Sequence, residues 1–306
     1  MKVPCSSPKL SNGLSDRVAL LDRVLGEFDV AGDVGCVAYS QSPAAVHYVR
    51  TRSGRHAYLK TTPAELGAEA LAAARRELRF YRELAPGLAC RTPGLMAGHD
   101  AEDGVAVLLT SAGRAVRPQS WSPGMWAASG RQLALLHDTP LPPGEDWRRP
   151  DPLLQAIADP DIDRIAACWA PVLPELPRIL GSASDLLSRE PVRQAVFTHG
   201  DCHTGNIAFL GDEPAFCDWQ AAVIGRPVSD LAFLSVRTAP SGVTVPPELL
   251  TAYLSHATGD RGDFERALVA EELAIFVFLW PHFSHLNTPA GIERVRRRVR
   301  SLASRV

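Results

Sequence analysis

The segment FTHGDCHTGNIAFLGDEPAFCDWQ, residues 197–220, carries the most informative pattern in the sequence. Its two short apolar runs flank turn residues at 211–214, a pattern that predicts a β-hairpin. In this hairpin Asn206 begins the first strand and Asp218 ends the returning strand, so the two side chains are expected side by side. Asp201 lies on the loop that leads into the hairpin.

These three polar residues suit the chemistry of phosphoryl transfer. Mg²⁺ takes few protein oxygens and completes its shell with phosphates and water, so Asn206 and Asp218 are predicted metal ligands. Asp201 is the predicted base that accepts a proton from an attacking hydroxyl. Phosphoryl transfer depends on this kind of positioning and charge stabilisation. Taken singly, an Asp or Asn in a loop more often forms a turn or caps a helix, but the ordered set favours the chemical interpretation.

A second signal lies far from the hairpin. Lys60 ends the predicted strand RHAYLK, and Glu77 lies in the predicted helix that follows, over residues 61–84. A lysine that binds phosphates needs a carboxylate to orient it, and a glutamate on the next helix can supply one. The alternatives are a surface lysine with an exposed glutamate, or a different partner such as Glu65 or Glu69.

Periodicity along the chain predicts an α+β protein with two lobes. Apolar residues of the segment 14–28 recur at helical spacing. Strands are predicted over 35–39, 45–50, 55–60 and 105–110. From Met125 onward the patterns are mostly helical, apart from the hairpin. We therefore expect a small strand-rich lobe over residues 1–110, which binds nucleotide, and a larger helical lobe over residues 111–306.

Composition excludes several classes of protein. The 306 residues are 46% apolar and 22% charged, as in ordinary globular proteins, and the net charge is −2. That charge gives no reason to expect nucleic acid or an anionic membrane as a partner. The arginine run RVRRRVR, residues 294–300, is interpreted as the solvated face of a terminal helix. The sequence makes no prediction of oligomeric state.

Cysteine usage and the N-terminal segment predict a cytoplasmic protein. The cysteines are too scattered for a zinc motif or a disulfide framework, which favours reduced thiols: Cys5, Cys36, Cys90, Cys168, Cys202 and Cys217. The first residues lack the apolar core of a signal peptide. The longest apolar run, LAIFVFLW from Leu273, is too short to span a bilayer.

From about Gly35 to about Leu234 the chain resembles the aminoglycoside phosphotransferase and choline kinase-like family, a branch of the protein-kinase-like fold. HGDCHTGN is similar to its catalytic loop, FCDWQ to its metal-binding motif, and GRPVSDLAFL to a segment whose buried aspartate braces that loop. The resemblance implies a catalytic base, two Mg²⁺ ligands and two residues at the phosphates of ATP (or GTP), which fall on Asp201, on Asn206 and Asp218, and on Lys60 and Glu77. It gives Asp230 the bracing role. We expect His199 to support the loop too, and His137 of LALLH to be a packing residue.

The chain departs from the kinase pattern in the loop over the phosphates. Kinases use a hairpin of sequence G-x-G-x-x-G, whereas VGCVAYSQSPAAVHYV here has Gly35 alone. We expect the hydroxyls of Ser40 and Ser42 to contact the phosphates instead. His203, next to the catalytic loop, is a further candidate for contact with phosphate or substrate.

The expected function is ATP- and Mg²⁺-dependent phosphorylation of a hydroxyl on a small molecule, with an antibiotic as the expected acceptor. Candidate carboxylates for a cationic acceptor are Asp159, Asp161, Glu271 and Glu272, although solvated positions in loops and helices are the better explanation for most of them. Nearby arginines dilute their charge, so we expect a nucleoside or peptide antibiotic of low or moderate positive charge ahead of an aminoglycoside. The alternatives are a metabolic kinase for choline or a sugar, a non-catalytic nucleotide-binding module, and a protein kinase. The last is disfavoured because no Ala-Pro-Glu motif follows Asp218.

Overall fold

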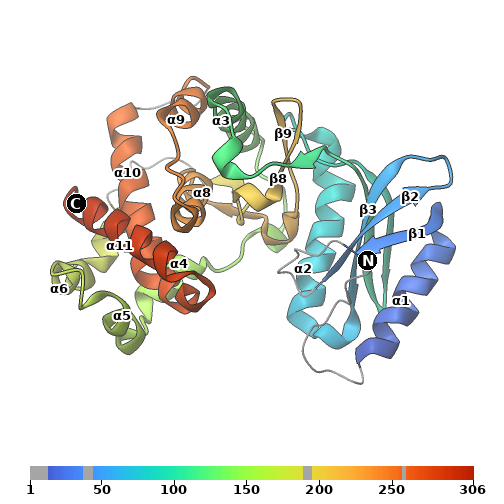
Figure 1. The fold of residues 1–306 in the computed structure, drawn as a ribbon, viewed down its shortest axis with the longest axis horizontal. Coiled ribbons are helices and arrows are strands. Elements are labelled where there is room, and N and C mark those ends of the chain that lie inside the picture. Colours follow the sequence, from blue (N-terminus) through green and yellow to red (C-terminus); the bar gives the residue numbers. More distant parts are fainter. Residues whose placement is uncertain (1–12, 37–43, 189–194, 257–259) are drawn as a thin grey trace. The chain divides into compact units, whose positions relative to one another are not determined.

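The structure is a computed structural model that describes residues 13–36, 44–188, 195–256 and 260–306 (Figure 1). The chain divides into two compact units. Unit 1 consists of Met1–Gly87, Thr92–Gly113 and Asp218–Ala221, and unit 2 of Leu88–Arg91, Arg114–Cys217 and Ala222–Val306. Unit 1 thus takes in a short segment, residues 218–221, from far beyond the first lobe expected from the sequence.

Unit 1 is built on one antiparallel sheet of five strands in the order β1-β2-β3-β5-β4. The strands are β1 (Val30–Cys36), β2 (Ala45–Thr51), β3 (His56–Pro63), β4 (Leu95–Ala101) and β5 (Gly104–Thr110). Side chains alternate between the two faces of a strand. Ala57 and Leu59 of β3 therefore face one side of the sheet, and Lys60 faces the other.

Helix α1 (Gly13–Glu27) covers the face that carries Leu59 (Figure 1). Its Leu20 and Val24 are buried in one cluster with Val49, Leu59 and other apolar side chains of the sheet. The helix predicted from the apolar periodicity of residues 14–28 is confirmed.

Helix α2 (Ala68–Arg79) packs on the opposite face, which carries Lys60. A Cβ atom at Gly98 of β4 would lie 2.4 Å from Leu78 Cδ1, so a larger residue there would displace the Leu78 side chain. The helix begins later than we predicted. The last residues of β3, Lys60 to Pro63, pair with β5, and Gly67, with φ of 91°, precedes the helix.

Unit 2 is mainly helical, and with the sheet of unit 1 it confirms the α+β class. Its helices are α3 (Pro123–His137), α4 (Pro152–Ala158), α5 (Ile162–Trp169), α6 (Leu176–Gly181), α7 (Ala183–Ser188), α8 (Ser229–Thr238), α9 (Pro247–Leu254), α10 (Arg261–Ala274) and α11 (Pro289–Ala303). Helices α3 and α9 pack closely at Gly130, where a side chain would lie 2.1 Å from the Leu249 carbonyl oxygen. No helix in the described parts of the chain is long and apolar enough to cross a membrane.

The predicted hairpin is present in unit 2. Strands β8 (Ile207–Leu210) and β9 (Glu213–Phe216) are antiparallel, with Ile207 opposite Phe216, and β6 (Arg114–Ala115) adds a third strand. The turn is shorter than predicted, because residue 214 already belongs to β9. Strands β7 (Val196–Thr198) and β10 (Val223–Gly225) form a separate pair on either side of the hairpin in sequence.

The core of unit 2 is formed by side chains of α4 to α8, α10 and α11, together with the turns after α10. Phe276 and Phe278 are buried there, as expected for core aromatic residues, whereas Phe283 is half exposed. The cysteines whose side chains the structure describes are free thiols, as the sequence predicted: Cys90, Cys168, Cys202 and Cys217.

Candidate functional site

The loop between β7 and β8 is held in unit 2 by the buried carboxylate of Asp230, the second residue of α8. Its Oδ2 accepts the His199 main-chain N–H at 2.8 Å, and its Oδ1 accepts the Gly200 N–H at 3.0 Å. His137 of α3 also contacts Oδ2, at 3.2 Å. Burial opposes the charged carboxylate, but the His137 contact and the His199 main chain outweigh burial and lower the pKa of Asp230. Gly200 has φ of 77°, which glycine adopts without strain.

The His199 side chain lies inside the loop and makes two bonds of opposite sense. Its Nδ1 accepts the Asp201 main-chain N–H at 3.3 Å, and its Nε2 lies 2.9 Å from the Cys217 carbonyl oxygen. An amide can only donate and a carbonyl can only accept, so the proton sits on Nε2. His199 thereby connects the loop to the end of the β8–β9 hairpin.

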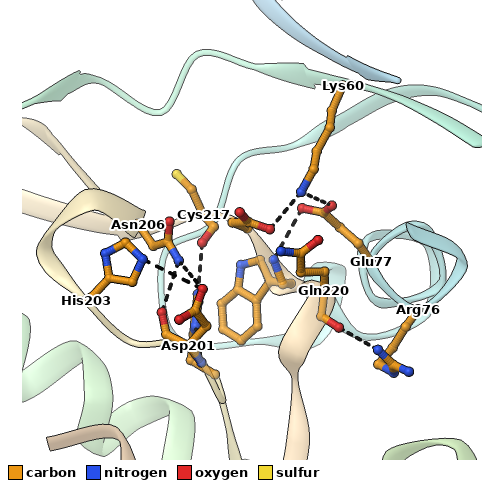
Figure 2. A network of polar contacts seen from close by, with 11 residues as sticks. Lys60, Arg76, Glu77, Asp201, His203, Asn206, Cys217 and Gln220 are labelled. Carbon is orange, nitrogen blue, oxygen red and sulfur yellow. Dashed lines mark hydrogen bonds and ion pairs between the residues drawn. The ribbon is translucent and has the colours of Figure 1, made fainter. Parts of the chain in front are cut away.

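Asp201 and Asn206 are in direct contact in unit 2 (Figure 2). Asn206 Nδ2 donates to Asp201 Oδ2 at 3.1 Å and to the Asp201 carbonyl oxygen at 3.0 Å. These bonds use the amide nitrogen of Asn206 and direct its oxygen Oδ1 away from Asp201. Asn206 lies in a short turn immediately before β8, so the strand begins one residue later than predicted. The Asn206 carbonyl oxygen accepts the Cys217 N–H at 2.8 Å.

His203 lies beside the same carboxylate. Its Nδ1 accepts the Gly205 N–H at 3.0 Å, and its Nε2 is 3.7 Å from Asp201 Oδ2 (Figure 2). The ring is therefore fixed at one nitrogen and turns the other toward Asp201.

Lys60 is the centre of the polar cluster in unit 1 (Figure 2). Its Nζ lies 2.7 Å from Glu77 Oε2 on α2 and 2.7 Å from Asp218 Oδ1. Burial works against the ammonium charge, but the two carboxylates outweigh burial and raise the pKa of Lys60. Burial also raises the pKa of Glu77, whereas Lys60 and the Trp219 N–H, which donates to Glu77 Oε1 at 3.2 Å, favour its charged form. We treat Lys60 and Glu77 as a charged pair, because the Lys60 ammonium lies 2.7 Å from the Glu77 carboxylate.

Helix α2 also fixes the DWQ segment, residues 218–220, within unit 1. Arg76 Nη1 donates to the Gln220 carbonyl oxygen at 2.6 Å, and the Trp219 ring stacks on Phe80 with centroids 4.0 Å apart. The segment begins at Asp218, whose φ of 64° is the only left-handed value outside glycine among the described residues. Helix α2 therefore positions both Glu77, the partner of Lys60, and the backbone that carries Asp218.

The donor groups fit a hard divalent cation. Lys60 engages one oxygen of Asp218, which leaves the second as a possible ligand, and Asn206 offers its amide oxygen. Among the described residues, no group of three or more His, Cys, Asp or Glu side chains could hold a metal ion by itself. Carboxylate and amide oxygens, taken in each unit by itself, suit a cation that completes its shell with phosphates and water.

The acidic residues expected to bind a cationic acceptor are placed differently. Glu271 and Glu272 are buried on α10 and ion-paired, Glu271 with Arg226 at 2.6 Å and Glu272 with Arg298 at 2.5 Å. Burial raises the pKa of Glu272, and Arg298 opposes that effect. The two exposed carboxylates lie at helix ends: Asp161 caps α5 and bonds Arg164, and Asp159 follows α4. The structure does not bring these four carboxylates together. Ser40 and Ser42 lie outside the described residues.

Two supporting contacts were not predicted. Arg226 of the GRPVSD segment joins Glu271 to Asp151, the N-cap of α4, at 2.5 Å. His137, interpreted as a packing residue, bonds Tyr253 of α9 at 2.9 Å as well as Asp230. A buried His, Tyr or Arg side chain needs a polar partner, but the sequence does not identify the residue that supplies it.

The chain is similar in fold to several solved structures. Solved structures similar over nearly the whole chain include amicoumacin kinase hAmiN in complex with AMP-PNP, Ca²⁺ and Ami (TM-score 0.61, 12% identity, 97% of each chain). Others are macrolide 2′-phosphotransferase MphH from Brachybacterium faecium (0.60, 19%, 93% of this chain and 98% of that one) and Plasmodium vivax ethanolamine kinase (0.60, 12%, 97% and 89%). At these identities the likeness shows the fold alone, and it confirms the protein-kinase-like fold that we expected.

No match is found among curated proteins. The sequence pattern of the phosphotransferase enzyme family, however, matches residues 41–268, which include the loop between β7 and β8, the DWQ segment and Lys60. The match spans most of the 306 residues. The chain therefore belongs to the phosphotransferase enzyme family.

Proposed function

We propose that this protein transfers the γ-phosphoryl group of ATP to a hydroxyl group of an antibiotic, with Mg²⁺ as the metal. The family and its structural neighbours support the broader class, a small-molecule phosphotransferase. A neighbour in complex with AMP-PNP and Ca²⁺ supports a nucleotide and a divalent cation.

The observation that carries the proposal is the cluster around Lys60. A buried ammonium at 2.7 Å from each of two carboxylates is a costly arrangement, because each charge is taken out of water. One partner comes from α2 and the other from the DWQ segment, so three distant parts of the sequence maintain it. In a phosphotransferase this arrangement positions the lysine for nucleotide phosphates and Asp218 for the metal.

Asp201 serves as the base in this proposal. As the acceptor oxygen bonds to the γ-phosphorus, the bond from phosphorus to the bridging oxygen of ADP breaks, and the hydroxyl proton moves to a carboxylate oxygen of Asp201. The Asn206 amide and the His199 ring hold Asp201 in place, and Asp230 fixes the loop that carries them. Bound Mg²⁺, ligated by Asn206 and Asp218, would neutralise charge on the phosphates.

The acceptor we favour is an antibiotic of low or moderate positive charge. The two carboxylates of α10 are already satisfied by arginines, so they offer little to a polycation. Asp159 and Asp161 are exposed, where single ion pairs contribute little. Two structural neighbours are named for amicoumacin and macrolide substrates and others for aminoglycosides, so the neighbours support an antibiotic acceptor, and the preference for low charge rests on the paired carboxylates alone.

A metabolic small-alcohol kinase is the second candidate. The ethanolamine kinase neighbour, with a TM-score of 0.60, is the observation that favours it. A choline-like or sugar acceptor would use the same base and metal ligands and differ in the acceptor pocket.

The test is a panel assay on purified protein with ATP and Mg²⁺. Nucleoside, peptide, macrolide and aminoglycoside antibiotics are compared with choline, ethanolamine and sugars, and mass spectrometry detects the phosphate adduct. The Asp201→Asn variant is the control and should lower kcat by about 10²-fold or more while ATP still binds. Adducts confined to ethanolamine, choline or sugars would favour the second candidate. An absence of nucleotide binding would reject both, and near-normal turnover in Asp201→Asn would remove Asp201 as the base.

A further inference from the structure

Helix α11 lines a cavity in unit 2 that has no part in the proposed reaction. The cavity has a volume of about 360 Å³, which is large enough for a small organic molecule. Three arginines of α11 line it, together with hydroxyl groups from α8 and from the loop before α9: Arg294, Arg297, Arg298, Ser235 and Thr244. Among the described residues, no carboxylate lines this cavity.

The arginines of the cavity are fixed to different degrees. Arg294 Nη1 donates to the Pro240 carbonyl oxygen at 2.8 Å, and Arg298 is paired with the buried Glu272 at 2.5 Å. Arg297 is exposed, and Glu293, one turn before it, is engaged by Arg296 at 3.4 Å. Two guanidinium groups are therefore positioned in advance, and the third adds charge that no carboxylate of the cavity balances.

The simplest alternative is that these arginines only form a solvated helix face, but the spacing of their charges argues against it. Some exposed arginines of other helices pair with acidic residues three or four positions away, as in Arg79 with Glu83 and Arg261 with Glu265. Like charges at that spacing, as between Arg294 and Arg297 or between Arg294 and Arg298, instead destabilise a helix. The cluster therefore has a cost in the free protein, which an anion in the cavity would remove.

A second cavity, of about 180 Å³, adjoins the first and shares Ser235 and Arg298 with it. Its lining is largely apolar and includes Val245, Leu249 and Leu268, and Arg305 lies there in addition to Arg298. Its two carboxylates are already paired, Glu272 with Arg298 and Glu265 with Arg261. The two cavities together therefore offer a cationic end and an apolar end.

We propose that the paired cavities beside α11 bind a small organic phosphate, with the phosphate among the three arginines and the apolar part against Val245, Leu249 and Leu268. Arginine suits this role because its planar fork donates two parallel hydrogen bonds to phosphate oxygens. This site shares no residue with the Lys60 cluster or with the loop that carries Asp201, and it involves no chemical step.

Isothermal titration calorimetry on the full-length protein tests the proposal with phenyl phosphate as the probe. Phenyl phosphate should bind at one site per chain, inorganic phosphate more weakly, and neutral phenol not measurably. Arg297→Gln should weaken phenyl phosphate binding about tenfold or more, because a charge-assisted hydrogen bond is lost. The matched control is Arg300→Gln on the same helix, which removes an exposed arginine that lines neither cavity and should leave binding unchanged.

Lys60→Ala should also leave phenyl phosphate binding intact, which separates this site from any nucleotide site. Binding equal in the wild-type protein and Arg297→Gln would overturn the proposal, as would an absence of binding to the wild-type protein. Loss of binding in Lys60→Ala alone would assign the phosphate to the nucleotide site instead. Equal affinity for inorganic phosphate and phenyl phosphate would overturn the assignment of the apolar end.

Discussion

Replacing Asp230 with Asn tests how the catalytic loop is held. Asp230 is 1% exposed and accepts the N–H groups of His199 and Gly200 at 2.8 and 3.0 Å, with His137 as a third contact at 3.2 Å. An asparagine at this position keeps one oxygen. Its amide NH₂ then faces the His199 or the Gly200 N–H, which is also a donor, so at least one of these main-chain N–H groups loses its acceptor.

The expected loss of stability follows from these contacts. A hydrogen bond to a charged acceptor contributes about 1.5–3 kcal/mol, and a buried donor left without an acceptor costs about 1–3 kcal/mol. The removal of a buried charge recovers part of this, because the charge no longer has to be desolvated. We therefore expect Asp230→Asn to lower the free energy of unfolding by about 3 kcal/mol.

Urea unfolding followed by circular dichroism measures this difference. The control is Asp163→Asn, an exposed aspartate of α5, which should change stability by less than about 0.5 kcal/mol. The native pKa of Asp230 is lowered, so its charge stabilises the protein above the ordinary pKa of about 3.9, and that contribution disappears as pH falls through the lower native value. The difference between wild type and Asp230→Asn should be constant near neutral pH and should shrink below about pH 4.

A loss smaller than about 1 kcal/mol would refute this reasoning, because it falls below the contribution of one charged hydrogen bond. A difference that grows as pH falls would refute it as well, since it would require the native pKa to be raised. In either case Asp230 would not be the group that braces the loop.

Four further predictions concern the Lys60 cluster, the acceptor and the helix packing. Asp218→Asn should abolish turnover that depends on a divalent cation, because an amide oxygen is a poor substitute for a carboxylate ligand; unchanged rate and unchanged dependence on Mg²⁺ would show that Asp218 is not a ligand. Glu77→Gln should raise the KM for ATP about tenfold in steady-state assays, because Lys60 loses a charged partner at 2.7 Å, and an unchanged KM would remove Glu77 from this role. The KM of the best acceptor should change by less than about threefold between low and high salt, whereas a steep rise would indicate a polycation held by exposed carboxylates. Gly130→Ala should lower the free energy of unfolding by about 2 kcal/mol or more, because the new methyl group would lie 2.1 Å from a carbonyl oxygen of α9. Its control is Gly26→Ala on α1, which meets no atom within 4 Å and should not destabilise the protein; equal effects of the two substitutions would contradict the packing argument.

The parts of the fold and site that the sequence predicted are those encoded by local patterns. The hairpin follows from two short apolar runs with a turn between them, and α1 follows from its apolar spacing. The residues alone left Glu65 and Glu69 as rivals of Glu77, and only the family resemblance implied that Lys60 and Glu77 act together; the structure shows Glu77 in contact with Lys60. The spacing along α2 decides this, because Glu77 is buried on the side that faces the sheet, whereas Glu69 lies exposed in the first turn.

Other features depend on contacts between distant segments and were not predicted. The third strand extends through residues 61–63 because β5 pairs with it, although the same residues also suit the start of a helix. Strands β7 and β10 are three residues each, too short for an alternating pattern, and they pair across the whole hairpin. The buried pairs of Glu271 and Glu272 could not be predicted either, since their arginine partners lie 45 and 26 positions away.

The conformation of Asp218 connects the fold to the proposed chemistry. Its φ of 64° costs a residue with a side chain about 1 kcal/mol or more, although Asp tolerates this region better than most residues. The neighbours on both sides are fixed, since the Cys217 N–H donates to the Asn206 carbonyl oxygen at 2.8 Å and the Trp219 N–H donates to Glu77 at 3.2 Å. The backbone at position 218 is thus determined from outside the residue, and the side chain must leave it in a direction that a regular strand or helix would not give. A strained residue that also carries a carboxylate bonded to a buried lysine is more readily explained by a role in binding than by stability, because glycine would meet the backbone requirement at lower cost.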